Sequence, residues 1–268
     1  LNSIWIRDYW PSYISASSHP AIVDHLYSRD RPSDDSLPTW LASGSIPLGR
    51  NLPVYFMDLI HAGGNFHVFS DGDGFMSSLV YDDNTSMTHT DIDDRIESYF
   101  NVNLTVFTGL PPRVDATGHI DMWLLPTGSR RVIISQFDPS IDTNGFTQTE
   151  AAAARLMNRG YTVYRIPAYN NGVRGAGGIH YSYTNAAIVN KRVFVPSYGG
   201  IHTKRDIAAQ SVFQTAMPGH EIIPVNCASI IADNGALHCI MKHVFAIPTP
   251  FIEGLRPMAG ETLRPGQP

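Results

Sequence analysis

The chain has 268 residues, 43% of them apolar and 16% charged, so it can bury a sizeable core without metal or disulfide staples. Its 24 acidic and 19 basic residues give a net charge of −5, which argues against nucleic acid and anionic membranes as partners. The sequence contains no apolar run of the roughly 18 residues that a membrane-spanning helix needs, and no signal segment opens it.

Strand-like and helix-like segments alternate along the chain. The opening Leu1-Asn2-Ser3-Ile4-Trp5 has the pattern of the middle of a strand, so we expect the natural N-terminus to lie elsewhere. A hairpin is predicted over residues 65–81 and a helix over 92–100. A β-α-β unit is then predicted from a strand over 131–136, a helix over 149–159 with Thr149 as N-cap and Gly160 as its end, and a strand over 161–167.

The C-terminal half continues this alternation. We predict a hairpin over 185–196 that turns near Asn190-Lys191, a helix over about 204–216 and a strand over 221–225. The Pro- and Gly-rich residues after Pro248 are expected to be irregular. The recurring strand-strand-helix-strand order predicts an α/β fold of repeated modules, assembled radially or by stacking.

Two cysteines, Cys227 and Cys239, are too few for a disulfide framework. They could form one bridge between neighbouring predicted strands or stay as free thiols. Two Asn-glycosylation sequons, at Asn84 and Asn103, fit a secreted or extracellular eukaryotic protein, with a cytoplasmic location as the alternative.

His119 and Asp121 form the first candidate site. Two residues apart on a strand, their side chains would point to the same face and could address one ligand together. A carboxylate can hold a cation, and an imidazole exchanges protons near neutral pH. The alternatives are a polar pair on an exposed edge strand or a metal site, although the sequence has no second compact His/Cys pair with zinc-like spacing.

Cys239 is the second candidate, because Gly235-Ala236 before it would allow a substrate to approach closely. A thiolate there could attack an electrophilic carbon. The alternative is a small core residue, which is also how we interpret Cys227. In an extended segment His238 would point away from Cys239, so the two are not expected to be ligands of one metal site.

Asp8 is the third candidate. Arg7-Asp8 could be an ion pair at a strand end. Together with Asp121, Asp8 could instead form a carboxylate clamp for a planar guanidinium, with Trp5 as an apolar wall.

Taken together, these motifs resemble a known group of enzymes. In chain order, Trp5-Ile6-Arg7-Asp8, Gly63-Gly64-Asn65, His119-Ile120-Asp121 and Ala236-Leu237-His238-Cys239 resemble the guanidine-modifying superfamily of agmatine, arginine and peptidylarginine deiminases. Finer matches resemble its bacterial-type, calcium-independent peptidylarginine deiminases: Arg7-Asp8-Tyr9-Trp10, Arg29-Asp30-Arg31-Pro32-Ser33-Asp34-Asp35, Arg192-Val193-Phe194-Val195-Pro196 and Thr215-Ala216-Met217-Pro218-Gly219.

The resemblance implies a pentein-type, pseudo-fivefold α/β propeller of ββαβ modules, formed as one catalytic domain over residues 1–268, with the site in its central channel. It implies no metal and no organic cofactor. The site residues that it implies are Cys239 as nucleophile, His119 as general acid and base, Asp8 and Asp121 as the guanidinium clamp, Asp71 and Asn185 near the substrate, and Arg29 and Arg31 on the C-terminal carboxylate of a peptide.

Some features depart from that pattern. The chain starts close to the first motif, so we expect the first module to be missing and to be supplied by a second polypeptide or a further segment. The immunoglobulin-like domain that follows in some relatives is also expected to be absent. Asp30 would partly neutralise Arg29 and Arg31, and Met241-Lys242 argues against agmatine.

The leading hypothesis is a hydrolase that converts arginine in peptides or proteins, including C-terminal arginine, to citrulline and ammonia. The alternatives are an agmatine or free-arginine deiminase, a non-catalytic propeller that binds guanidinium groups, and a metal-dependent hydrolase that uses His119 and Asp121.

Overall fold

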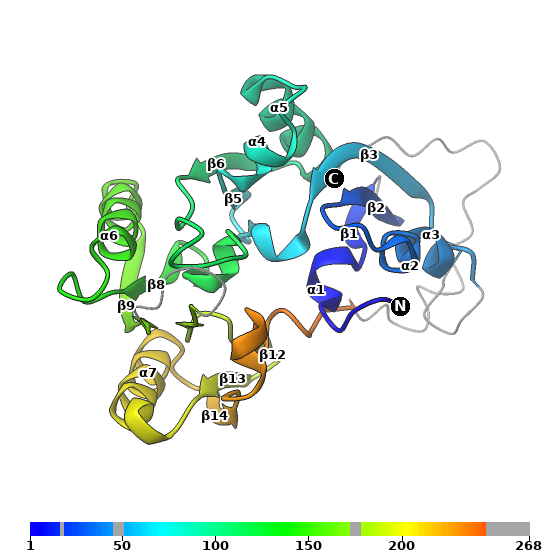
Figure 1. Ribbon diagram of the computed structural model, residues 1–268. Helices are drawn as coiled ribbons and strands as arrows, with labels where there is room; N and C mark the ends of the chain where they lie inside the picture. The colour runs from blue at the N-terminus through cyan, green and yellow to red at the C-terminus, as the bar shows by residue number, and fades with distance from the viewer. Residues whose placement is uncertain (17–18, 45–50, 172–177, 245–268) are drawn as a thin grey trace. The chain divides into compact units, whose positions relative to one another are not determined.

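The structure is a computed structural model, and it describes residues 1–16, 19–44, 51–171 and 178–244 (Figure 1). The irregular segment predicted after Pro248 lies outside these residues. The chain divides into two compact units, the first made of residues 1–63, 81–104 and 242–268 and the second of residues 64–80 and 105–241. The single catalytic domain over 1–268 stays a prediction.

The first unit contains a three-stranded sheet in the order β1-β2-β3. Strands β1 (Ser12–Ala16) and β2 (His19–Tyr27) are antiparallel, and β3 (Val54–His61) runs parallel to β2. Because parallel neighbours need a crossover, the chain forms two short helices between them, α2 (Pro32–Asp35) and α3 (Leu37–Ala42). Tyr9, Trp10, Tyr27, Leu37 and Leu41 pack as the local core.

The strand pattern of Leu1 to Trp5 is not borne out, since these residues form no strand and helix α1 (Ile6–Tyr9) follows them directly. The Asp8 amide donates to the Trp5 carbonyl and the Trp10 amide to that of Ile6, both at 3.1 Å. Tyr9 is almost fully buried, and its hydroxyl donates to the Ser3 carbonyl at 2.8 Å. Tertiary burial of Tyr9 thus outweighs the strand propensity of Ile4-Trp5-Ile6.

The second unit contains two copies of one module. In the first copy β7 (Leu124–Gly128) and β8 (Arg131–Gln136) are antiparallel, and α6 (Thr143–Asn158) leads to β9 (Thr162–Pro167), which is parallel to β8. The second copy has the same order in β12 (Ala187–Val189), β13 (Arg192–Ser197), α7 (Thr203–Ala216) and β14 (Glu221–Asn226). Helix α6 packs on β8 and β9 of its own sheet, whereas α7 packs on β13 and β14 and also on β9 of the first copy (Figure 1).

A further three-stranded sheet has the order β4-β5-β6. Its strands are β4 (His67–Val68), β5 (Asp73–Ser77) and β6 (Asn103–Phe107), with α4 (Leu79–Asp83) and α5 (His89–Phe100) between β5 and β6. Strands β10 (Tyr169–Asn170) and β11 (His180–Tyr181) form a two-stranded ribbon. The predicted repetition of a strand-strand-helix-strand module is confirmed in the described residues.

The elements predicted from residue 131 onward are confirmed, with one shifted boundary. Helix α6 begins at Thr143 rather than near Thr149, because the Asp142 carboxylate accepts the Gly145 amide at 2.9 Å and caps the helix. Gly145, which looks like a helix breaker, is required there because a Cβ atom would come within 2.9 Å of the Phe137 ring. Thr149 lies buried inside the helix and donates to the Gly145 carbonyl.

Both sequons lie in described segments. Asn84 is buried, and its side-chain amide accepts the Ile60 amide at 2.9 Å and donates to the Ile60 carbonyl at 2.7 Å. Asn103 is exposed at the start of β6. Cys227 and Cys239 are both buried free thiols.

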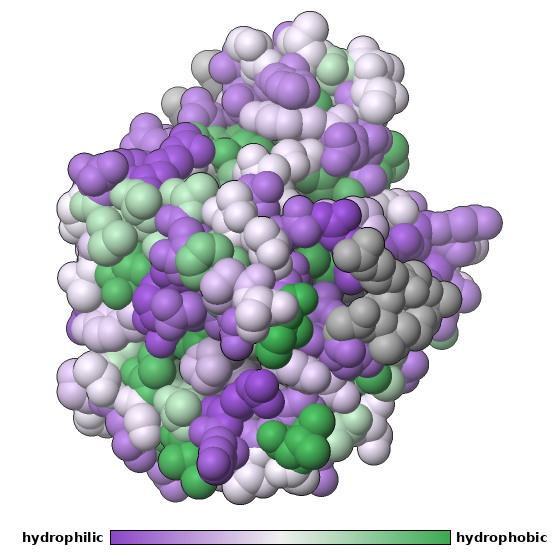
Figure 2. Space-filling view, turned by 60° about the vertical axis from the view of Figure 1, so that its left-hand side comes forward, coloured by the Kyte–Doolittle hydropathy of each residue, from purple (hydrophilic) through white to green (hydrophobic). Residues whose placement is uncertain are grey.

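Two surface properties bear on partners. Within the described residues, the helices are too short or too polar to cross a membrane. Figure 2 shows one face on which hydrophilic and hydrophobic residues are interspersed.

Candidate active site

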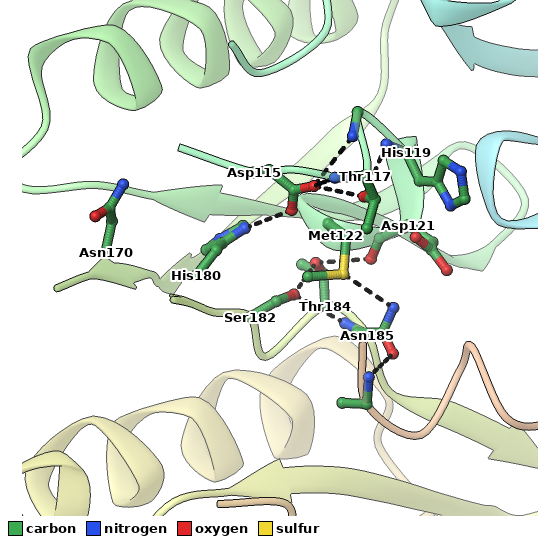
Figure 3. Close-up of polar contacts among 12 residues, drawn as sticks. Asp115, Thr117, His119, Asp121, Met122, Asn170, His180, Ser182, Thr184 and Asn185 are labelled. Atoms are coloured by element: carbon green, nitrogen blue, oxygen red, sulfur yellow. Dashed lines mark hydrogen bonds and ion pairs between the residues drawn. The ribbon is translucent and has the colours of Figure 1, made fainter. Parts of the chain in front are cut away.

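The segment that carries His119 and Asp121 is held by a buried acidic turn. The Asp115 carboxylate accepts the Thr117 and Gly118 amides at 2.8 and 3.1 Å, and the Thr117 hydroxyl accepts the His119 amide at 3.1 Å (Figure 3). Gly118 has a φ of 69°, a backbone conformation that is unfavourable for residues with a side chain. These bonds therefore fix the conformation of the loop that precedes His119.

His119 and Asp121 do not lie on a strand, so that expectation is wrong. Asp121 belongs to the 3-10 helix η2 (Ile120–Met122), and His119 is its extended N-cap. The Ile120 amide donates to Asn65 Oδ1 at 3.1 Å, and Asn65 also pairs with the backbone of Ser77. The side chains of His119 and Asp121 are both buried, and in Figure 3 they point the same way, away from Asp115.

Asn65 explains the Gly63-Gly64-Asn65 motif. These residues form the 3-10 helix η1 (Gly63–Asn65), and Asn65 is 1% exposed. The Ser77 hydroxyl, which lies beside it, donates to the Gly118 carbonyl at 2.6 Å. The motif thus fixes the backbone on which Asp121 sits. This role could not be predicted from the sequence because it depends on bonds to distant residues.

Asn185 holds the turn that carries Cys239. Its Oδ1 accepts the backbone amides of Ala236, His238 and Cys239 at 3.0, 3.1 and 3.3 Å. Its Nδ2 donates to the Cys239 sulfur at 3.0 Å and to the Met122 sulfur at 3.4 Å. Asn185 is fully buried, and one side chain therefore fixes both the backbone and the sulfur of Cys239.

Asp121 joins this turn to η2. Its Oδ2 accepts from His238 Nδ1 at 2.6 Å and lies 3.6 Å from the Cys239 sulfur, which is placed to donate to it. His238 and Cys239 lie in a turn rather than in an extended segment, so these neighbouring side chains can converge on one oxygen. Asp121, Asn185, His238 and Cys239 are named here the thiol cluster.

A second buried pair supports the loop before His119. His180 Nδ1 donates to Asp115 Oδ2 at 2.8 Å, and the His180 ring packs against Phe137 (Figure 3). Burial alone would raise the pKa of Asp115, but the hydrogen bonds from His180 and Thr117 outweigh it and the pKa is lowered. Asp115 is thus held as a carboxylate. Neither Asp115 nor His180 was among the predicted site residues.

The first unit holds the predicted residues Trp5, Asp8, Arg29 and Arg31. Asp8 is buried on α1, Trp5 is its half-buried N-cap residue, Arg29 is exposed, and Arg31 is half-buried at the N-cap of α2. Arg31 Nη1 donates to the Tyr27 hydroxyl at 3.2 Å. Burial raises the pKa of Tyr27 to about 12, Asp8 adds to the rise, and Arg31 and Arg29 oppose it. Asp8 and both arginines thus lie within electrostatic range of one tyrosine.

Lys242 and His25 also lie close to Asp8. Burial lowers the pKa of Lys242 to about 7, Arg7 lowers it further, and Asp8 opposes this. His25 Nε2 donates to the Asp8 carbonyl at 3.0 Å, and burial together with Lys242 lowers the pKa of His25 to about 4. A Cβ atom at Gly63 would overlap the Arg7 carbonyl oxygen. Asp8, Arg7, Lys242 and His25 are named here the charged cluster.

Asp71 lies in the exposed turn between β4 and β5. Its neighbour in that hairpin, Asp73, is buried and accepts from Tyr161 and Arg159. No group of three His, Cys, Asp or Glu side chains within the described ranges is arranged to hold a metal ion.

Comparison with known proteins gives a consistent result. The sequence profile of the Porphyromonas-type peptidyl-arginine deiminase family matches residues 1–244. A Lactococcus lactis protein that bears the name agmatine deiminase is 27% identical over 287 residues, which cover 90% of this chain and 74% of that protein.

Two solved structures extend the comparison. A Porphyromonas gingivalis protein named as an arginine deiminase has a TM-score of 0.76 and 21% identity, covering 89% of this chain and 74% of that one. The agmatine deiminase of Enterococcus faecalis has a TM-score of 0.73 and 22% identity, covering 88% and 73%. The chain therefore has the α/β fold, with small sheets, that is found in these guanidine-modifying enzymes.

Proposed function

The chain belongs to the Porphyromonas-type peptidyl-arginine deiminase family, and from this premise we propose that it hydrolyses peptidyl-arginine to peptidyl-citrulline and ammonia. Membership confirms the resemblance inferred from its motifs. The observation that carries the proposal is the thiol cluster, in which a buried cysteine sulfur lies 3.0 Å from the Asn185 amide and 3.6 Å from the Asp121 carboxylate.

In the first half-reaction Cys239 gives up its thiol proton to solvent and attacks the central carbon of the guanidinium as a thiolate. The Asn185 Nδ2 hydrogen bond favours this thiolate, because a donor favours the anionic form. A carbon–sulfur bond forms, one carbon–nitrogen bond breaks, and the departing nitrogen takes a proton from His119 and leaves as ammonia. The product is a covalent S-alkylthiouronium.

In the second half-reaction water replaces the sulfur. His119, which gave up its proton, takes one from a water molecule as that water attacks the thiouronium carbon. A carbon–oxygen bond forms, the carbon–sulfur bond breaks, and the second water proton leaves with the sulfur, so that Cys239 is released as a thiol together with citrulline. No redox step occurs, so the protein's own side chains complete the cycle.

Two carboxylates, Asp8 and Asp121, are proposed to hold the guanidinium plane. Arginine stays protonated at all physiological pH values, and a planar cation is best fixed by carboxylates that accept its N–H groups in pairs. The pseudo-fivefold propeller, with the site in its central channel, is part of the proposal.

The substrate is proposed to be a peptide with C-terminal arginine. Its carboxylate would bind Arg29 and Arg31, whose charges already act on the neighbouring Tyr27. Agmatine is the second candidate, because the Lactococcus and Enterococcus relatives carry that activity in their names. Agmatine has no carboxylate, so the two arginines would be dispensable for it.

The test compares a peptide ending in arginine, the same peptide amidated, agmatine and free arginine, with ammonia and citrulline or carbamoylputrescine measured. We expect the free peptide acid to react fastest. Cys239→Ala should abolish turnover, with Cys227→Ala, which removes the other buried thiol, as the matched control. Ammonia production that Cys239→Ala leaves unchanged would refute the proposal.

The arginines decide between the two candidates. Arg31→Ala should raise KM for the free peptide acid about tenfold and leave KM for agmatine unchanged, because only the peptide offers a carboxylate. Arg192→Ala, which removes an exposed arginine paired with Glu221, is the control. Faster turnover of agmatine than of every peptide, unaffected by Arg31→Ala, would establish the agmatine candidate instead.

A further inference from the structure

His238 has no part in the chemistry proposed above, yet it makes a short polar contact to Asp121. Its Nδ1 lies 2.6 Å from Asp121 Oδ2, and the two side chains are 9% and 0% exposed. The same oxygen lies 3.6 Å from the Cys239 sulfur. Asp121 therefore differs from an ordinary buried acid, because an imidazole and a thiol both lie beside the same carboxylate oxygen.

The side chain and the backbone of His238 make different contacts. The backbone amide donates to Asn185, which fixes the turn whatever the side chain is. The imidazole must carry its proton on Nδ1, since a carboxylate oxygen can only accept. The imidazole therefore serves Asp121 rather than the fold of the turn.

We propose that His238 is a positioning residue that keeps Asp121 ionised and fixes the orientation of its carboxylate for the substrate guanidinium. This rests on the proposed function and adds a residue to it. A hydrogen bond to the charged form of a buried acid favours that form, and without it burial would favour the neutral acid, which cannot hold a cation. By occupying Oδ2, the Nδ1–H group also stops the carboxylate from rotating about its Cβ–Cγ bond.

The other titratable groups around Asp121 in this unit cannot replace His238. Cys239 offers a weak S–H donor at 3.6 Å. The His67 ring packs on His238 with centroids 5.4 Å apart, and its Nε2 donates to the Leu124 carbonyl at 2.9 Å. His119 precedes Asp121 on the same segment and is the proposed acid and base. The His238 N–H group donates to Asp121 Oδ2 at the short distance of 2.6 Å.

Two polar substitutions separate this role from a structural one. In His238→Asn the side-chain amide nitrogen can take the place of Nδ1, whereas in His238→Gln it takes the place of Nε2 and leaves Asp121 Oδ2 without its donor. The kinetics of wild type and both variants should be measured from pH 5 to 9 on the best guanidino substrate, with thermal unfolding as a check. His89→Ala, which removes an exposed imidazole stacked on Tyr81, is the control.

We expect His238→Gln to lower kcat/KM at pH 7 about tenfold and to move the acid limb of the profile up by about one pH unit, the equivalent of one charge-assisted hydrogen bond. His238→Asn should recover most of both, although it cannot ionise. Equal losses in folded Asn and Gln variants, or a wild-type profile in the Gln variant, would overturn the inference while wild-type activity upholds the proposed function. A wild type that turns over no guanidino substrate would instead defeat the proposed function and this inference with it.

Discussion

The thiol cluster and the charged cluster use opposite means to hold a buried aspartate. Asp121 accepts from His238 and lies beside the Cys239 thiol, and the neighbouring Asn185 amide is fully engaged. Asp8 instead lies among basic groups, with Arg7 and Lys242 acting on one another and on it. Directional hydrogen bonds fix positions, whereas point charges fix mainly the balance of charge. We therefore expect the first cluster to respond to geometry and the second to pH.

The largest effect is expected at Asn185. Asn185→Ala removes the acceptor of three backbone amides and the donor to the Cys239 sulfur, so kcat should fall about a hundredfold or more. The free energy of unfolding should fall by about 3 kcal/mol, because buried amides lose their acceptor. Single-turnover kinetics and denaturant unfolding measure the two effects.

Asn170→Ala is the matched control for that variant. Asn170 is another buried asparagine, bonded to Arg113 and Asp142. It should lose stability but keep kcat within about threefold. If both variants lose kcat equally, the geometry of the thiol cluster is not what limits the reaction.

An intermediate effect is expected at Asp115. Asp115→Asn keeps the oxygen that accepts the Thr117 and Gly118 amides but loses the charge that pairs with His180. Stability at pH 7 should fall by about 2 kcal/mol. Because the folded-state pKa of Asp115 is lowered, this contribution is complete above the ordinary aspartate pKa and is lost as pH falls through the lowered value.

The check is the free energy of unfolding of wild type and Asp115→Asn between pH 7 and pH 3. Their difference should shrink below about pH 4. A constant difference across this range would mean that Asp115 acts through its shape and not through its charge.

The smallest effect is expected at Lys242, in the charged cluster. Its pKa is lowered to about 7 in the folded protein, so between about pH 7 and the ordinary lysine value near 10.4 the unfolded chain binds the extra proton. Stability must therefore rise with pH over that window. Lys242→Met lacks this rise, and the melting temperature of wild type relative to the variant should increase by a few degrees from pH 7 to pH 9. If the melting temperatures of wild type and Lys242→Met change in parallel with pH, the expectation that the charged cluster responds to pH is wrong.

The elements with a clear period and clear ends were predictable from sequence. The strand over 131–136 and the helix ending before Gly160 follow from apolar periodicity and end signals, which act over a few residues. The start of α6 was missed because Gly145 looks unfavourable until the Phe137 ring against it is seen.

The site was predictable as a set of residues but not as a geometry. Cys239 and Asp121 were selected from their neighbours in sequence, and the structure places them 3.6 Å apart. Their backbones depart from the predicted strands because side-chain amides far along the chain hold them. Asn65 binds the Ile120 amide from 55 residues away, and Asn185 binds the Cys239 sulfur from 54 residues away. Local patterns carry no information about such contacts, which is why the contact between His238 and Asp121 was not predicted.

The buried Asn84 amide has a consequence for biosynthesis. A carbohydrate on Asn84 would prevent the pairing with the Ile60 backbone that joins it to β3, so oligosaccharide transfer there and completion of this fold exclude each other. Asn103 carries no such conflict, since its side chain is already in solvent. In a secretory compartment, a mature, folded molecule should therefore carry sugar mass at the second of these asparagines alone.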